Sequence, residues 1–150
     1  MARGRDDGSR SESTLRLCRS ASAFAATEMR HLLCAWADAL GVPPDHRGAV
    51  ELACYEAMAN VVSHAYAGRS TGPMEMTAVY RHAPPGSPRM TVTVGDHGRW
   101  RTPVLDPTRL RGRGVAMIRS LSGAADIESS DAGTTVRMSW DLSLASAIAS

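Results

Sequence analysis

The chain has 150 residues, 43% of them hydrophobic, which is enough for one domain that buries its own core. Its 17 basic and 15 acidic residues nearly cancel to a net charge of +2, and no basic cluster alternates with aromatic residues, so we expect no direct nucleic-acid binding. No stretch approaches the ~20 apolar residues of a membrane-spanning helix, so we expect no membrane segment.

Neither the N-terminus nor the cysteines indicate export. Residues 1–13 are charged and small with no apolar run behind them, so they read as a disordered leader rather than a signal peptide or anchor. Cys18, Cys34 and Cys54 are widely spaced and form no CxxC pair. We expect three buried, reduced thiols and a cytoplasmic protein.

The first half of the chain predicts one short strand and two helices. Residues 14–19 alternate between apolar and polar side chains, as a strand does. Helical spacing of apolar residues then runs from about residue 22 to residue 40 and stops at Gly41. A second helix opens at Pro44 or Asp45 and runs to about Tyr66. The apolar positions are Phe24, Met29, Leu32, Leu33, Trp36 and Leu40 in the first helix, and Val50, Ala53, Cys54, Ala57, Met58, Val61 and Val62 in the second.

The second half predicts mainly strands. Period-two patterns indicate two strands joined by a hairpin loop rich in Pro and Gly, and two further strands flanking a turn. Between the two hairpins lie a polar loop and a helix that begins at glycine. The ranges are strands 74–82 and 90–94, hairpin loop 83–88, polar loop 97–111, helix 112–121, strand 124–129, turn 131–133, strand 134–142, and a flexible tail 143–150.

This order predicts an α/β (α+β) two-layer sandwich formed by residues 14–142. The helices cluster in the first half, and the strands come mainly as hairpins. We therefore expect a mixed, mostly antiparallel sheet of about five strands, covered on one face by about three helices.

Glu56 and Asn60 lie one helical turn apart on an otherwise apolar segment. Residues i and i+4 project from the same helix face, so a carboxylate that takes a proton and a carboxamide that supplies an oxygen ligand would lie together. The same spacing is typical of an ordinary solvated helix face. A functional interpretation therefore depends on the motifs that follow.

Two of these motifs suit a nucleotide. Asp96 ends an apolar strand and Gly98 follows it, which puts a carboxylate at the mouth of the core, where an adenine amino group could donate to it. A simple turn has the same pattern. Gly112-Arg113-Gly114 precedes a helix, where free N–H groups and the helix dipole attract phosphate, although a flexible loop end also fits. There is no GxxxxGK[ST] phosphate loop.

In this order, the motifs resemble those of the GHKL (Bergerat-fold) ATPases, and among them the small anti-sigma-factor serine kinases of the RsbW and SpoIIAB type. The resemblance covers residues 14–142 and implies the histidine-kinase-like ATPase fold. Arg99-Trp100 stands where the family's first glycine box often has a second glycine. The matching boxes are Glu56-Ala-Met-Ala-Asn60 with His64-Ala-Tyr66 behind it, Asp96-His-Gly98, Gly112-Arg-Gly114 and Gly133-Thr-Thr-Val136.

The resemblance also implies roles for these residues. Asn60 would hold a Mg²⁺ that bridges the phosphates, and Glu56 would orient or deprotonate the attacking hydroxyl. Asp96 would accept a hydrogen bond from the adenine amino group. Thr134 would complete the base site through its hydroxyl or a water, and Gly98 would allow close approach.

Further roles fall on the loop that would close over ATP. Residues 97–111 would form this lid, and Gly112 and Gly114 would let backbone amides fold over the phosphates. Either Arg111 or Arg113 would offset charge on the γ-phosphate. His64, behind the N box, is counted among the ATP-binding residues.

The resemblance implies an ATP-dependent serine/threonine kinase that phosphorylates a STAS-domain anti-sigma-factor antagonist and sequesters a sigma factor. It also implies a homodimer. One alternative is an ATP-responsive binding module of a partner-switching system without kinase activity. Another is an α/β scaffold that binds no ligand.

Overall fold

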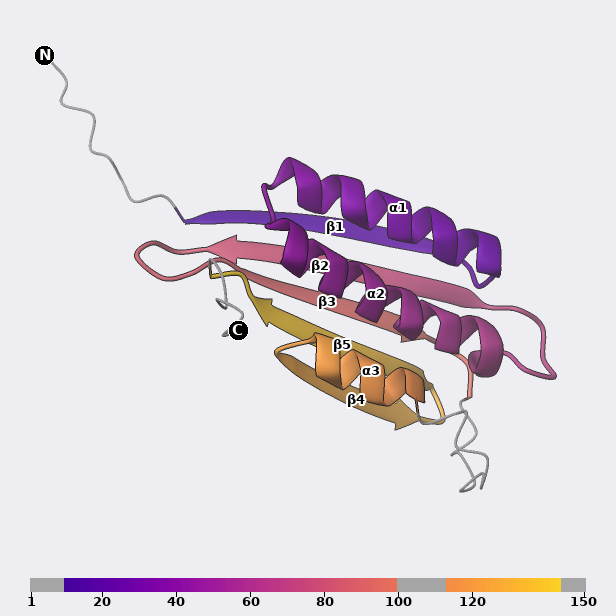
Figure 1. The fold of residues 1–150 in the computed structure, drawn as a ribbon. Coiled ribbons are helices and arrows are strands. Elements are labelled where there is room, and N and C mark those ends of the chain that lie inside the picture. Colours follow the sequence, from indigo (N-terminus) through magenta and orange to yellow (C-terminus); the bar gives the residue numbers. More distant parts are fainter. Residues whose placement is uncertain (1–9, 100–112, 144–150) are drawn as a thin grey trace, which may run out of the picture.

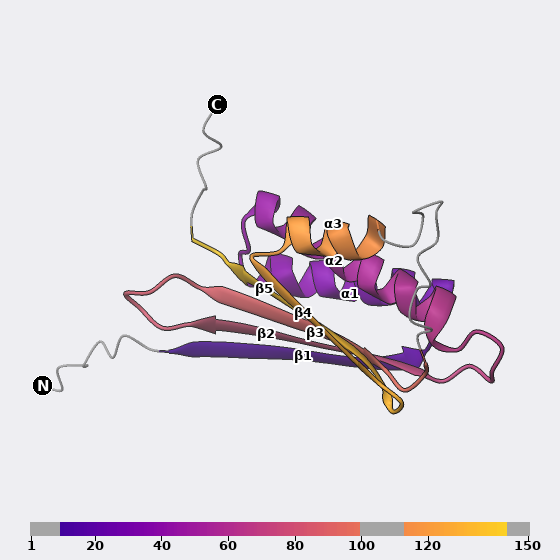
Figure 2. The same ribbon diagram turned by 90° about the horizontal axis from the view of Figure 1, so that it is seen from below.

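The computed structural model describes residues 10–99 and 113–143, which form one sheet and a layer of helices. The five strands pair in the order β1-β2-β3-β5-β4, and all four pairings are antiparallel. The helices lie on one face of the sheet, which Figures 1 and 2 show from two directions. The elements are β1 Ser11–Ser20, α1 Ala23–Ala39, α2 Pro44–Asn60, β2 Pro73–His82, β3 Arg89–Asp96, α3 Arg113–Leu121, β4 Ala124–Ser130 and β5 Gly133–Asp141.

The predicted two-layer sandwich is confirmed, with differences in detail. We expected a mixed sheet, but the described strands form no parallel pair. The first strand begins at Ser11 rather than residue 14. The second helix is α-helical only to Asn60 and continues as a π-helical turn, Val61–Ala65. Of the three cysteines, only Cys54 is buried, whereas Cys18 is exposed.

Strand alternation builds the core, because every second side chain of the central strands points toward the helices. These side chains are almost fully buried, and many of them are methionines, whose flexible chains fill irregular gaps. The Trp140 indole satisfies its polar edge by donating to the Leu121 carbonyl at 2.8 Å. The inward residues are Met74, Met76 and Ala78 in β2, Met90, Val92 and Val94 in β3, and Val136, Met138 and Trp140 in β5.

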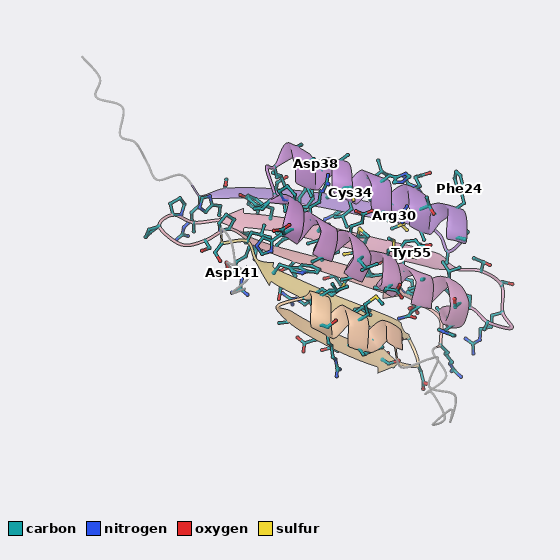
Figure 3. The ribbon with its side chains drawn as sticks, in the orientation of Figure 1. Phe24, Arg30, Cys34, Asp38, Tyr55 and Asp141 are labelled. Carbon is teal, nitrogen blue, oxygen red and sulfur yellow. The ribbon has the colours of Figure 1, made fainter. Side chains whose placement is uncertain are left out.

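Helix α1 begins and ends where the sequence signals place it, but its buried stripe differs from the expected one. The Ser22 hydroxyl caps the helix by accepting from the Ala25 amide at 3.0 Å, and Gly41 follows the end with a φ of 75°. Phe24 is 79% exposed and points away from the sheet, and Leu32 is 39% exposed (Figure 3). Small residues allow α1 to lie close to the sheet instead: Ala25, Ala26 and Ala37 are buried beside Met29 and Leu33.

Helices α1 and α2 are also joined at their surface. The Arg30 guanidinium lies 4.9 Å from the centre of the Tyr55 ring (Figure 3). Arg47 donates to both carboxylate oxygens of Asp38 at 2.8 and 2.9 Å. These surface contacts add to the apolar packing that α1 and α2 share in the core. Within the described part of the chain, no helix is both long and apolar enough to cross a membrane.

Candidate functional site

The site begins where β3 ends and β5 starts, at a pair of buried polar residues. Asp96 and Thr134 are directly opposite in the register and are 5% and 1% exposed, and they are the only buried polar residues in the described part of the chain. One oxygen of the Asp96 carboxylate accepts from the Gly98 amide at 2.9 Å and from the Thr134 amide at 3.3 Å. Burying a carboxylate is costly unless donors meet it, so these contacts hold Asp96 in place.

Two glycines let the backbone pass close to this carboxylate. A Cβ on Gly98 would lie 1.9 Å from the Ala65 carbonyl oxygen, and a Cβ on Gly133 would lie 1.9 Å from the carbonyl oxygen of Asp96. Gly133 also has a φ of 142°, which side chains rarely tolerate. Only glycine fits at either position without a backbone shift.

Thr134 is held from the neighbouring strand. Its hydroxyl lies 3.0 Å from the Ser129 hydroxyl, and Ser129 is the residue opposite Thr134 on β4. This contact fixes the Thr134 side chain beside Asp96.

The end of α2 brings a second set of polar groups to the same end of the sheet. Glu56 and Asn60 are half-buried in its last turns, four residues apart and therefore on one face. The helix then widens into the π-helical turn Val61–Ala65, which includes the half-buried His64. Such turns are rare and often mark functional sites.

The backbone beyond Asp96 is attached to this helix end. The Arg99 amide donates to the Ala65 carbonyl at 2.8 Å, and the His97 amide donates to the Tyr66 hydroxyl at 3.0 Å. The His97 ring lies 3.4 Å from Glu75 on β2. The Asp96 turn and the end of α2 are thus one connected unit.

Helix α3 also starts at this end of the molecule, next to the ends of α2 and β3 (Figures 1 and 2). Gly114 lies in its first turn, where backbone N–H groups have no partner within the helix. A helix N-terminus of this kind attracts an anion. The end of the sheet therefore combines a carboxylate that accepts, a carboxamide and a carboxylate on α2, and a helix start suited to phosphate.

Comparison with protein families shows to which family this chain belongs. The family model described as Histidine kinase-like ATPase domain matches residues 19–140. The chain belongs to this family. All the site residues described in this subsection lie within the matched segment.

Solved structures share the histidine kinase-like ATPase fold. The structure of the RsbU and RsbW domains of Rv1364c from Mycobacterium tuberculosis matches with a TM-score of 0.65 and 24% identity, over 87% of this chain and 32% of that one. The SiaB-SiaC complex from Pseudomonas aeruginosa matches with a TM-score of 0.54 and 20% identity, over 82% and 88% of the two chains. The chain thus spans about a third of the first structure. A comparison with curated protein sequences finds no match.

Within this histidine kinase-like ATPase domain, most of the predicted site residues gather at one end of the sheet. Gly98 and Thr134 both donate to Asp96. Glu56, Asn60 and His64 lie on the adjoining end of α2 and its π turn. Gly114 lies at the start of α3. Arg111 and Gly112 lie outside the described residues, as do the side chain of Arg113 and most of the predicted lid, 97–111.

Sequence reasoning gave no role to two residues of the site, Tyr66 and Ser129. Tyr66 was noted only as part of His64-Ala-Tyr66, and its contact with His97 spans 31 positions, which no local pattern encodes. Ser129 is more accessible to sequence reasoning. The hairpin turn before Gly133 fixes the register of the two strands, and this register sets Ser129 opposite Thr134.

Proposed function

We propose that the chain is an ATP-binding anti-sigma factor with serine/threonine kinase activity. It phosphorylates a STAS-domain anti-sigma-factor antagonist and, when unopposed, sequesters a sigma factor. The observation that supports this most is the buried Asp96 carboxylate, which is held by the Gly98 and Thr134 amides beside the helix end that carries Glu56 and Asn60.

Adenine fits the donor and acceptor chemistry at Asp96. A buried carboxylate accepts from an amino group, whereas guanine would present its O6 acceptor to the same oxygen. An unsatisfied buried acceptor typically costs ~1–3 kcal/mol, so the site should prefer ATP to GTP. Gly98 and Gly133 let the backbone pack closely around this carboxylate, which keeps it at a fixed place in the proposed base site.

Mg²⁺ fits the site only together with phosphate. Among residues 10–99 and 113–143, no three His, Cys, Asp or Glu side chains come together as a metal site. An ion held through the Asn60 oxygen would therefore need oxygen ligands from the phosphates and from water, as is usual for Mg²⁺. Bound there, Mg²⁺ would neutralise charge on the phosphates, and Glu56 would orient or deprotonate the attacking hydroxyl.

The partners are proposed from the similarity to partner-switching proteins. The RsbW domain of the mycobacterial structure and the SiaB-SiaC complex support a STAS-type antagonist as substrate. A sigma factor and a second copy of this chain complete the proposed set of partners.

The test is phosphoryl transfer in the presence of Mg²⁺-ATP and candidate STAS-domain proteins, followed by mass spectrometry for phosphoserine and phosphothreonine. Glu56→Ala should bind ATP but transfer no phosphate, because binding and chemistry use different residues. Asn60→Ala should lose the Mg²⁺-dependent part of ATP binding. ATP at 100 times its Kd should raise the free energy of unfolding by ~2.7 kcal/mol.

Three outcomes would contradict this proposal in different ways. ATP binding without any modified partner, with wild type and Glu56→Ala indistinguishable, would favour an ATP-responsive binding module. Equal loss of binding in Glu56→Ala and Asn60→Ala would show that the two roles are wrongly assigned. If ATP left the melting temperature unchanged, the chain would not bind ATP, and the α/β scaffold that binds no ligand would be the remaining interpretation.

A further inference from the structure

Tyr66 is the first residue after the π-helical turn, and its hydroxyl makes two backbone contacts. It donates to the Pro73 carbonyl at the start of β2 and accepts from the His97 amide at 3.0 Å. Its ring packs against the backbone of Gly72, where a Cβ would lie 2.5 Å from a ring carbon. One side chain therefore links the end of α2, the start of β2 and the turn after β3.

Three consecutive amides beyond Asp96 are held by nearby groups. The His97 amide donates to the Tyr66 hydroxyl, the Gly98 amide donates to the Asp96 carboxylate, and the Arg99 amide donates to the Ala65 carbonyl. Two of the three acceptors thus come from adjacent residues at the end of the same helical segment. The direction of the Asp96 carboxylate is fixed by this turn, and the turn is fixed by residues 65 and 66.

The Ala65 carbonyl is available because it lies at the end of the helical segment. The last carbonyls of a helix lack partners within the helix, and here one of them is satisfied by Arg99 instead. Any side chain at position 98 would collide with this carbonyl, so the Asp96 turn approaches the helix end as closely as two backbones can.

We propose that Tyr66 is a positioning residue, which holds the Asp96 turn at a fixed place relative to Glu56 and Asn60. This inference rests on the proposed function, in which Asp96 binds the adenine base and the end of α2 binds the phosphates. Its consequence is that Tyr66 sets both the affinity for ATP and the preference for adenine indirectly, through the position of the Asp96 turn. A tyrosine hydroxyl is protonated at neutral pH, so it can donate and accept at once, and burial raises the pKa of Tyr66 further above its usual value.

The test compares Tyr66→Phe with wild type and with Tyr80→Phe. Tyr80 is a half-buried tyrosine at the opposite end of β2, so it controls for the loss of a hydroxyl. Tyr66→Phe should lower ATP affinity about tenfold, the effect expected when one hydrogen bond to the nucleotide is misplaced. The ratio of ATP affinity to GTP affinity should also fall. Its melting temperature should stay close to that of Tyr80→Phe, which a purely structural role would not predict.

Hydrogen exchange, measured by NMR without nucleotide, tests the link itself. The His97 amide should exchange faster in Tyr66→Phe than in wild type, while amides in the centre of β3 should not change. Gly72→Ala should have the same effect, because the new methyl group displaces the ring and moves its hydroxyl away from His97.

The outcomes separate this inference from the proposed function. If wild type binds ATP and Tyr66→Phe binds it equally well with the same base preference, the inference is overturned and the proposed function stands. If no variant binds ATP, the proposed function fails, and positioning of the nucleotide fails with it. Unchanged exchange at His97 in both Tyr66→Phe and Gly72→Ala would overturn the link between the turn and the helix.

Discussion

Strands β3 and β5 form four inward-facing residue pairs, and the last pair differs in kind from the other three. All four pairs lie on the helix-covered face and all are buried to a similar degree. Three pairs are apolar and pack against the helices, whereas the fourth is a carboxylate opposite a hydroxyl. In order, the pairs are Met90–Trp140, Val92–Met138, Val94–Val136 and Asp96–Thr134.

Burial thus serves two purposes on the same two strands. The apolar pairs stabilise the sheet by removing apolar surface from water. The Asp96–Thr134 pair gains nothing from burial as such, and its carboxylate depends on the Gly98 and Thr134 amides. This polar pair is the one that the proposed ATP site would use.

Asp96→Asn should separate the polar pair from the apolar pairs most strongly. The substitution keeps the side-chain volume and retains an oxygen that can accept from Gly98, so the fold should remain stable. It also introduces an NH₂ donor where the adenine amino group would donate. We expect ATP affinity to fall about 100-fold, or ~3 kcal/mol, when measured by calorimetry.

Met138→Ala, two pairs away on β5, is the opposite control. Met138 is fully buried, so its truncation should lower the free energy of unfolding by about 2–5 kcal/mol in urea titrations. ATP affinity of the folded fraction should be unchanged. If Asp96→Asn retained ATP binding, or if Met138→Ala lost it, the division between packing pairs and a binding pair would be wrong.

A smaller effect is expected from glycine substitutions on either side of Asp96. Gly98→Ala puts a methyl group 1.9 Å from the Ala65 carbonyl oxygen, so the Asp96 turn must move away from the helix end. Gly95→Ala meets nothing closer than 3.9 Å, the carbonyl oxygen of Thr134. We expect the free energy of ATP binding to weaken by ~1–3 kcal/mol in Gly98→Ala and to stay near the wild-type value in Gly95→Ala. Similar affinities in the two variants would contradict a close contact at Gly98.

The sequence allowed prediction of those parts of the site that depend on local pattern. Period-two alternation up to Val94, followed by Asp96 and Gly98, predicted a carboxylate at the mouth of the core, and Asp96 is buried at the end of β3. Helical spacing predicted that Glu56 and Asn60 share a face of one helix, and both lie in α2.

The remainder depended on tertiary contacts. Val61–Ala65 has the composition of ordinary helix, and its π geometry accompanies the contact between Ala65 and Arg99. Helical period alone placed Phe24 and Leu32 in the core, but close packing of α1 on the sheet favoured its alanines. The side-by-side position of β3 and β5 also lay beyond local pattern, because the segment between them includes a helix and another strand.

A last prediction concerns two thiols in the helix layer, Cys34, which is half-buried, and Cys54, which is fully buried. Burial raises the pKa of the Cys34 thiol from 9.0 to about 11, with a further contribution from Glu51, and burial also raises the pKa of Cys54. Above pH 9.0 the unfolded chain releases these protons while the folded chain keeps them, so the free energy of unfolding should fall as pH rises toward about 11. Urea titrations across this range should show the decline, and Cys34→Ala with Cys54→Ala should flatten it. A decline of equal slope in the double variant would assign the alkaline instability to other groups, Tyr66 foremost, since burial raises its pKa as well.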